Sequence, residues 1–117
     1  MGNNIEIGRR GELLAKQYLV SNSYNILNMN YRNKIGEIDI IAMHNNILVF
    51  IEVKTRTSTK YGYPYEAVNR KKQEKIIYTS LLYLKQNGFK GIQLRYDIIE
   101  VYLTQGTRIN HIDNAFC

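Results

Sequence analysis

The chain has 117 residues, enough for one hydrophobic core and too few for two, so we expect a single domain over residues 1–117. Hydrophobic residues make up 44% of the chain and charged residues 22%, proportions that exclude an intrinsically disordered protein. The formal net charge of +6 favours a polyanionic partner, although lysines that only keep a small domain in solution would give the same balance.

The numbers of cysteine and histidine residues and the length of the apolar runs argue against a disulfide-stabilised, zinc-binding, secreted or membrane-spanning protein. A single cysteine, Cys117, cannot form an intrachain disulfide, and His44 and His111 are too few to complete a Cys/His zinc site. The N-terminal segment lacks the apolar core of a signal peptide, and the longest apolar run, residues 47–51, is far shorter than a membrane span. We therefore expect a cytoplasmic protein that does not enter the membrane.

Hydrophobic spacing predicts an α/β fold. The expected elements are a helix over residues 5–20, a weak strand over 24–31, strong strands over 36–43 and 47–54, a loop over 55–64, a helix over 65–86, and a strand or strand pair over 92–103. This α-β-β-β-α-β order makes an antiparallel meander followed by a helical crossover, which predicts a mixed sheet flanked by helices.

The second helix should bury a stripe centred on Ile77, Leu81 and Leu84, flanked by Ile76 and Tyr83, and should end at Asn87-Gly88. On the last strand, Arg95 and Asp97 alternate and are expected to pair with each other.

The two strong strands carry an unusual set of charges. Alternate residues of a strand share a face, so Glu37 lies beside Asp39 and Glu52 lies beside Lys54. A two-residue turn at residues 45–46 suits asparagine, and paired residue numbers then sum to 91. This register places Asp39 opposite Glu52 and Glu37 opposite Lys54, with Cβ atoms roughly 5 Å apart.

Opposed carboxylates destabilise a hairpin unless they share a proton or bind a cation. Two oxygen donors among apolar neighbours suit Mg²⁺ or Mn²⁺, so Asp39 and Glu52 are candidate metal ligands. Lys54 could orient an attacking water or stabilise negative charge on phosphorus. The alternative is that these charges form ordinary surface ion pairs on a solvated sheet face. We favour the catalytic site, because the register brings three charges together inside two hydrophobic strands.

Glu12 is a further candidate metal ligand and catalytic residue. It lies in a helical stripe with Gly8, Ala15 and Leu19, so it points toward whatever the first helix packs on. Gly8 and Gly11 would allow the backbone to approach closely there. A glutamate at a helix edge is commonly just solvated, so the spacing alone does not decide its role.

Basic residues gather after Lys54 and are interleaved with tyrosines, a composition that can follow a phosphate backbone and stack on bases. Lys72 and Gln73 also extend the apolar stripe of the second helix backward, toward the predicted site. A solvated start of that helix explains Arg70 and Lys71 equally well. The candidate nucleic-acid contacts are Arg9, Arg10, Arg56, Lys60, Arg70, Lys71, Lys72 and Gln73.

Three segments together resemble a known family. Gly-Arg-Arg-Gly-Glu (8–12), Gly-Glu-Ile-Asp-Ile-Ile-Ala (36–42) and Val-Phe-Ile-Glu-Val-Lys-Thr-Arg (49–56) are similar to the YraN family of small bacterial proteins. That family resembles archaeal Holliday-junction resolvases and, more distantly, the PD-(D/E)xK nucleases. The resemblance implies a restriction-endonuclease-like core, with the superfamily's site pattern on Glu12, Asp39, Glu52 and Lys54. Ile38 stands where the proline of that motif would be.

These features predict a Mg²⁺- or Mn²⁺-dependent endonuclease that hydrolyses phosphodiester bonds in DNA, with branched and flapped DNA among the candidate substrates. One alternative is a non-catalytic DNA-binding accessory protein that keeps the nuclease fold, and another is a basic domain without a nucleic-acid role. The acid-x-lysine set favours the enzyme, because a pure binder gains nothing from opposed acids. Resemblance to resolvases also implies a homodimer.

Overall fold

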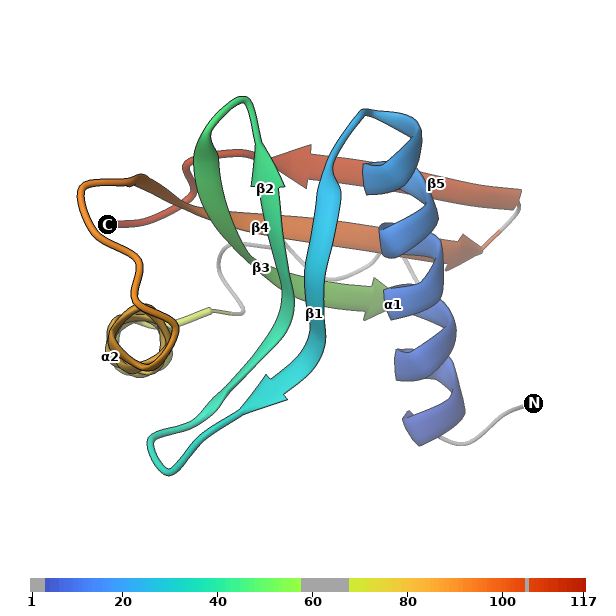
Figure 1. Ribbon diagram of the computed structural model, residues 1–117. Coiled ribbons are helices and arrows are strands. Elements are labelled where there is room, and N and C mark those ends of the chain that lie inside the picture. Colours follow the sequence, from blue (N-terminus) through green and yellow to red (C-terminus); the bar gives the residue numbers. More distant parts are fainter. Residues whose placement is uncertain (1–3, 58–67, 105) are drawn as a thin grey trace.

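The computed structural model describes residues 4–57, 68–104 and 106–117, which form a mixed α/β domain with two helices and five strands (Figure 1). The elements are α1 (Asn4–Ser21), β1 (Asn25–Arg32), β2 (Glu37–His44), β3 (Ile47–Arg56), α2 (Arg70–Gln86), β4 (Gln93–Thr104) and β5 (Gly106–Ile112). Neither of these two helices is long and apolar enough to cross a membrane.

All five strands belong to one sheet, in the order β1-β2-β3-β4-β5. Neighbouring strands are antiparallel except β3 and β4, which are parallel and joined by the segment that contains α2. The predicted meander and helical crossover are therefore confirmed. The last strand, β5, was not predicted, because its sequence Gly-Thr-Arg-Ile-Asn-His-Ile lacks the apolar content of an interior strand and forms a sheet edge.

Helix α1 packs on the sheet through a stripe of small and apolar side chains. Gly11, Ala15 and Leu19 are buried. A Cβ atom at Gly11 would lie 1.8 Å from Thr55 Oγ1, so the helix can approach β3 only because this residue has no side chain. A Cβ atom at Gly8 would meet nothing within 4 Å, so the predicted close approach occurs at Gly11 alone.

Helix α2 begins at Arg70, because Asn69 caps it by accepting a hydrogen bond from the Lys72 N–H at 2.9 Å. Residues 65–67 of the predicted helix, like residues 58–64 of the predicted loop, lie outside the described residues. The helix ends as predicted, before Asn87 and a Gly88 with φ of +70°.

The buried face of α2 differs from the predicted stripe. Ile76, Thr79, Ser80 and Tyr83 are buried, whereas Leu81 is 46% exposed, so its predicted burial is wrong. The Thr79 and Ser80 hydroxyls donate to backbone carbonyls one turn back, which lets polar side chains occupy the packed face. Ile77 and Leu84 are partly buried against the same hydrophobic cluster, so the predicted stripe is confirmed except at Leu81, and the centre of the buried face is shifted toward Thr79 and Ser80.

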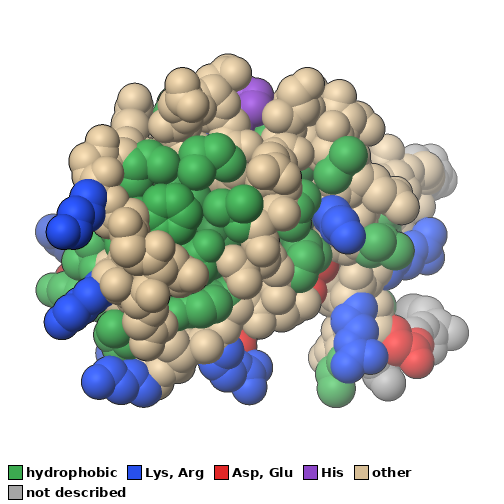
Figure 2. Space-filling model, viewed as in Figure 1, with side chains coloured by type: hydrophobic (Ala, Val, Ile, Leu, Met, Phe, Trp, Pro, Cys, Tyr) green, Lys and Arg blue, Asp and Glu red, His purple; other side chains and the backbone are tan. Residues whose placement is uncertain are grey.

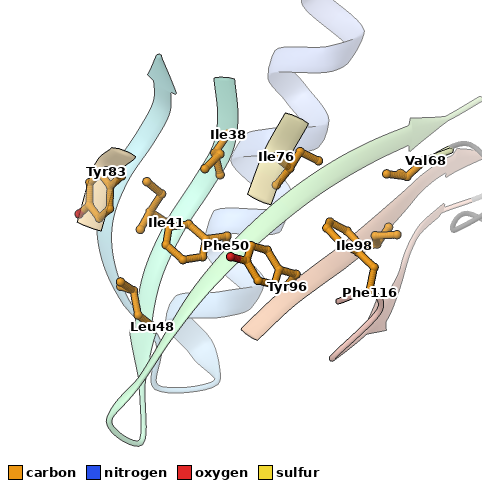
Figure 3. Packing of buried hydrophobic residues seen from close by; sticks show 10 residues of the cluster. All are labelled: Ile38, Ile41, Leu48, Phe50, Val68, Ile76, Tyr83, Tyr96, Ile98 and Phe116. Atoms are coloured by element: carbon orange, nitrogen blue, oxygen red, sulfur yellow. The ribbon is translucent and has the colours of Figure 1, made fainter. Parts of the chain in front are cut away.

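The two faces of the sheet carry separate clusters of hydrophobic residues. One cluster, drawn in Figure 3, packs Phe50, Tyr96 and Ile98 together with Ile76 and Tyr83 of α2. The other packs α1 against the opposite face. In the view of Figure 2, hydrophobic side chains form a continuous area, and lysine and arginine side chains lie mainly at its margins.

Asp97 ties the C-terminal strands to the rest of the fold. Its fully buried carboxylate accepts hydrogen bonds from the Arg95 side chain and, at 3.0 Å, from the Asn114 N–H. One of its oxygens also lies 2.7 Å from His111 Nε2. The predicted pairing of Arg95 with Asp97 is confirmed, at 2.8 Å. The other His111 nitrogen is 2.9 Å from the hydroxyl of Tyr18, so the network reaches α1.

We predict that Gly11→Ala and Gly8→Ala change stability in opposite directions. The alanine methyl group at position 11 overlaps Thr55 and should lower the free energy of unfolding by about 2 kcal/mol. At position 8 there is space, and the better helix propensity should raise it by up to about 1 kcal/mol. Urea denaturation of both variants checks this, and equal effects would contradict the close packing at Gly11.

Candidate functional site

The β2–β3 hairpin has the predicted register as far as it is paired. Partners run from His44 opposite Ile47 to Ile40 opposite Ile51, and Asn45 and Asn46 turn with φ of 50° and 63°. The ladder stops at Ile40–Ile51. Just beyond this last pair, the Val53 N–H donates to Asp39 Oδ2 at 2.8 Å. A side-chain carboxyl group therefore accepts the hydrogen bond that a backbone carbonyl would accept if the ladder continued. The site begins where the ladder ends.

Asp39 and Glu52 contact each other at this end of the ladder. Burial raises the pKa of Asp39 to about 9, with a further contribution from its hydrogen bond to Glu52. Burial also acts to raise the pKa of Glu52, but the hydrogen bond from Asp39 and the charge of Lys72 outweigh it, and the net shift is downward. Without a cation, the pair is therefore compatible with one shared proton that resides on Asp39.

Two lysines border the pair. Lys72 Nζ lies 3.2 Å from Glu52 Oε2, which places the first turn of α2 against the end of β3. Burial and the neighbouring Lys72 lower the pKa of Lys54. Burial also acts to lower the pKa of Lys72, but its hydrogen bond with Lys54 and the charge of Glu52 outweigh this and raise it. Lys54 therefore loses its proton more readily than an ordinary lysine.

Glu12 lies at the margin of the site. It lines one surface depression together with Asp39, and burial raises its pKa, with smaller upward contributions from Glu37 and Glu52. Within the described residues, however, no three His, Cys, Asp or Glu side chains are grouped closely enough to hold a metal ion together. The structure thus joins Asp39 and Glu52 directly and leaves Glu12 as a neighbour that acts through its charge.

Glu37 does not pair with Lys54, so that prediction is wrong. Glu37 instead lies opposite Arg32 across the β1–β2 pair, and their side chains form an exposed ion pair at 2.7 Å. The physical reason is that the β2–β3 ladder ends at Ile40, before it reaches position 37.

A cationic depression of about 600 Å³ adjoins Glu52 on the α2 side. Lys71, Lys72 and Lys75 line it from α2, and Arg32 and Lys34 line it from the β1–β2 turn. Arg32 and Lys34 were not predicted as site residues. Their charge is visible in the sequence, but only the fold shows that this turn faces the start of α2.

The remaining nucleic-acid candidates lie in different surroundings. Arg9 lines the depression that holds Glu12 and Asp39. Arg10 is exposed on α1, and Arg70 is exposed 3.9 Å from Glu74. Gln73 donates to the Val68 carbonyl at 2.8 Å, which secures the start of α2. Lys60 lies outside the described residues.

Arg56 forms an ion pair with Glu100 that was not predicted from the sequence. Its Nε donates to Glu100 Oε2 at 3.0 Å, and Glu100 is fully buried. The Tyr102 hydroxyl donates to the other carboxylate oxygen. A glutamate inside an apolar strand carries no sequence signal of its partner, since β3 and β4 are far apart in the chain.

Fold and site together define a mixed α/β domain with paired carboxyl groups and two lysines at the end of a β-hairpin ladder. The chain belongs to the family described as "Uncharacterised protein family UPF0102", whose model matches residues 11–101, and the resemblance to YraN proteins is thereby confirmed.

Relatives of nearly equal length are similar throughout. A UPF0102 protein of Caldanaerobacter subterraneus is 48% identical over 118 residues, covering 97% of both chains. The corresponding protein of Clostridioides difficile is 50% identical over 114 residues, and that of Alkaliphilus oremlandii is 51% identical over 116 residues. Each of these two alignments covers 97% of this chain and 99% of the relative.

We predict that Asp39→Asn stabilises the metal-free protein increasingly as the pH rises from 5 to 8. An aspartic acid in the unfolded chain loses its proton near pH 4, whereas Asp39 keeps its proton up to about pH 9 in the fold. The folded chain then binds more protons than the unfolded chain, so wild-type stability falls with pH, by at most about 1.4 kcal/mol per unit. Denaturation in the presence of a chelator measures this, and parallel curves for variant and wild type would contradict it.

We predict that Arg56→Ala destabilises the fold far more than Arg32→Ala. Removing Arg56 leaves the buried Glu100 without its cation, at a cost of about 3 kcal/mol. The Arg32–Glu37 ion pair is the matched control, because its N–O distance is shorter but its side chains are 78% and 60% exposed. Its loss should lower the free energy of unfolding by about 1 kcal/mol or less. Similar urea midpoints for the two variants would show that Glu100 does not depend on Arg56.

Proposed function

We propose that this protein is a Mg²⁺- or Mn²⁺-dependent endonuclease that hydrolyses phosphodiester bonds in DNA, including branched or flapped DNA. The observation that carries the proposal is the juxtaposition of Asp39 and Glu52 at the end of the β2–β3 ladder, where the Val53 N–H donates to Asp39 and Lys72 Nζ lies 3.2 Å from Glu52 Oε2. Family membership alone is neutral, since the family's description assigns no activity.

Two other buried acids show why this pair is unusual. Asp97 is neutralised by Arg95, and Glu100 is neutralised by Arg56. Asp39 instead contacts another acid, and burial makes that arrangement costly unless a proton or a cation lies between the two groups. A fold that only needed stability would gain by replacing either acid.

The donor set fits a hard divalent cation. Asp39 and Glu52 supply carboxylate oxygens, and Mg²⁺ typically takes one or two carboxylates while leaving positions for water and phosphate. Glu12 would hold a water of the ion, consistent with its place at the margin of the site. When bound, the ion would supply water activation and neutralise charge on the phosphate.

The lysines then divide two tasks. Lys54 is partly buried and has a lowered pKa, so its amine can hold the attacking water or donate to the phosphate as negative charge develops there. Lys72 is exposed enough to meet substrate and already contacts Glu52. Lys34, Lys71 and Lys75 line the adjoining depression, where a phosphate backbone would be attracted.

Cleavage is tested on labelled branched, flapped, single-stranded and continuous duplex DNA, with Mg²⁺, Mn²⁺ or a chelator. We expect metal-dependent cleavage of at least one of these substrates, and none by Asp39→Asn or Glu52→Gln. DNA binding by the wild type without cleavage under any metal would favour a non-catalytic DNA-binding accessory protein instead.

We predict that Lys54→Ala and Lys71→Ala separate turnover from binding. Lys54 acts at the reacting phosphorus, so its loss should slow single-turnover cleavage about 100-fold or more and change DNA affinity little. Lys71 is an exposed cation in the depression, so its loss should weaken binding and flatten the salt dependence while the saturated rate stays near that of wild type. Equal saturated rates for Lys54→Ala and wild type would remove Lys54 from the catalytic site.

We further propose that the protein acts in the cytoplasm as a homodimer, whose two sites could cut two strands. The dimer proposal rests on the resemblance to resolvases. Light scattering during gel filtration, with and without DNA, tests it: a monomer under both conditions would refute it.

A further inference from the structure

We propose that Arg56 and Arg108 form a second phosphate-binding station, beyond the carboxyl pair, that guides the DNA strand toward the β5 edge of the sheet. The proposal rests on the nuclease function proposed above and adds a path for its substrate. Its core is a group of four side chains that are paired across three strands: Arg56, Glu100, Tyr102 and Arg108.

The station lies on the same sheet face as the site. On β3, Glu52, Lys54 and Arg56 alternate along one face, and the β4 partners of the last two are Glu100 and Tyr102. Glu52 and Arg56 are four residues apart, or about 13 Å along the strand. A single DNA strand can span that distance, so one strand can place a phosphate at Arg56 while another of its phosphates lies at the carboxyl pair.

The buried acid positions the first arginine. Glu100 is fully buried and accepts from Arg56 Nε at 3.0 Å, while the Arg56 side chain remains 22% exposed. A guanidinium that binds a carboxylate through Nε can still present its Nη groups to a phosphate in a bidentate contact. Glu100 thus acts as a positioning residue, holding the arginine fork in place before substrate arrives.

Tyr102 positions the second arginine. Its hydroxyl donates to Glu100, and the guanidinium carbon of Arg108 lies 4.1 Å from the centre of its ring. Both arginines also lie close enough to the phenol to oppose the rise in its pKa that the hydrogen bond to Glu100 causes. Arg108 is exposed on the edge strand β5, so its guanidinium group is accessible from solvent at this edge of the sheet.

The test measures binding of fluorescein-labelled single-stranded and duplex oligonucleotides over a range of salt concentrations, in the chelator-treated protein so that no cleavage occurs. Arg108→Ala should raise Kd several-fold and reduce the slope of log K against log salt by about 0.9, the value for one lost phosphate contact on duplex DNA. Arg56→Lys keeps a charge for Glu100 but loses the planar fork, and should also weaken binding.

Lys90→Ala is the matched control. Lys90 is an exposed cation that precedes β4, near the start of β3 rather than its end, so its loss should leave Kd and the salt slope unchanged. If Arg108→Ala behaves like Lys90→Ala, the station is refuted while the nuclease proposal stands. If the wild type binds no DNA at any salt concentration, both proposals fail.

Discussion

The site depends on one constraint, which is that Asp39 and Glu52 share a mostly buried space where the β2–β3 ladder ends. In water, two carboxylates this close would repel weakly, but burial removes the solvent that screens them. The fold meets the constraint with the Val53 N–H beside Asp39 and with Lys72 beside Glu52, and the raised pKa of Asp39 favours a proton on that residue. In the proposed function, a bound cation would take the place of that proton.

The register of the hairpin and the crossover of α2 bring the lysines to this point. Strand alternation sets Lys54 beside Glu52, but Lys72 comes from a helix that returns over the sheet after β3. The Asn69 cap fixes where that helix begins, and Gln73 secures it to Val68. Because Lys72 lies in the first turn after this cap, the local signal at Asn69 helps to place Lys72 beside Glu52.

Buried charge is handled in two different ways within one small domain. Asp97 and Glu100 each receive an arginine and further hydrogen bonds, which makes them fixed parts of the fold. Asp39 and Glu52 are left next to each other, with less compensation. Such incomplete pairing is expected where a fold trades stability for a binding or catalytic site, and in the proposed function a bound cation would complete it.

The sequence by itself determined the strands β2 and β3, their register from His44–Ile47 to Ile40–Ile51 and the proximity of Asp39 to Glu52 just beyond it, because strand period and an Asn-Asn turn are local properties. It also indicated the meander, the crossover and the family. Tertiary structure alone decided which face of α2 is buried, that Glu37 pairs with Arg32, and that Glu100 holds Arg56. These features depend on contacts between segments that are distant in the chain or on where a ladder stops, and side-chain spacing along a single element carries no information about either.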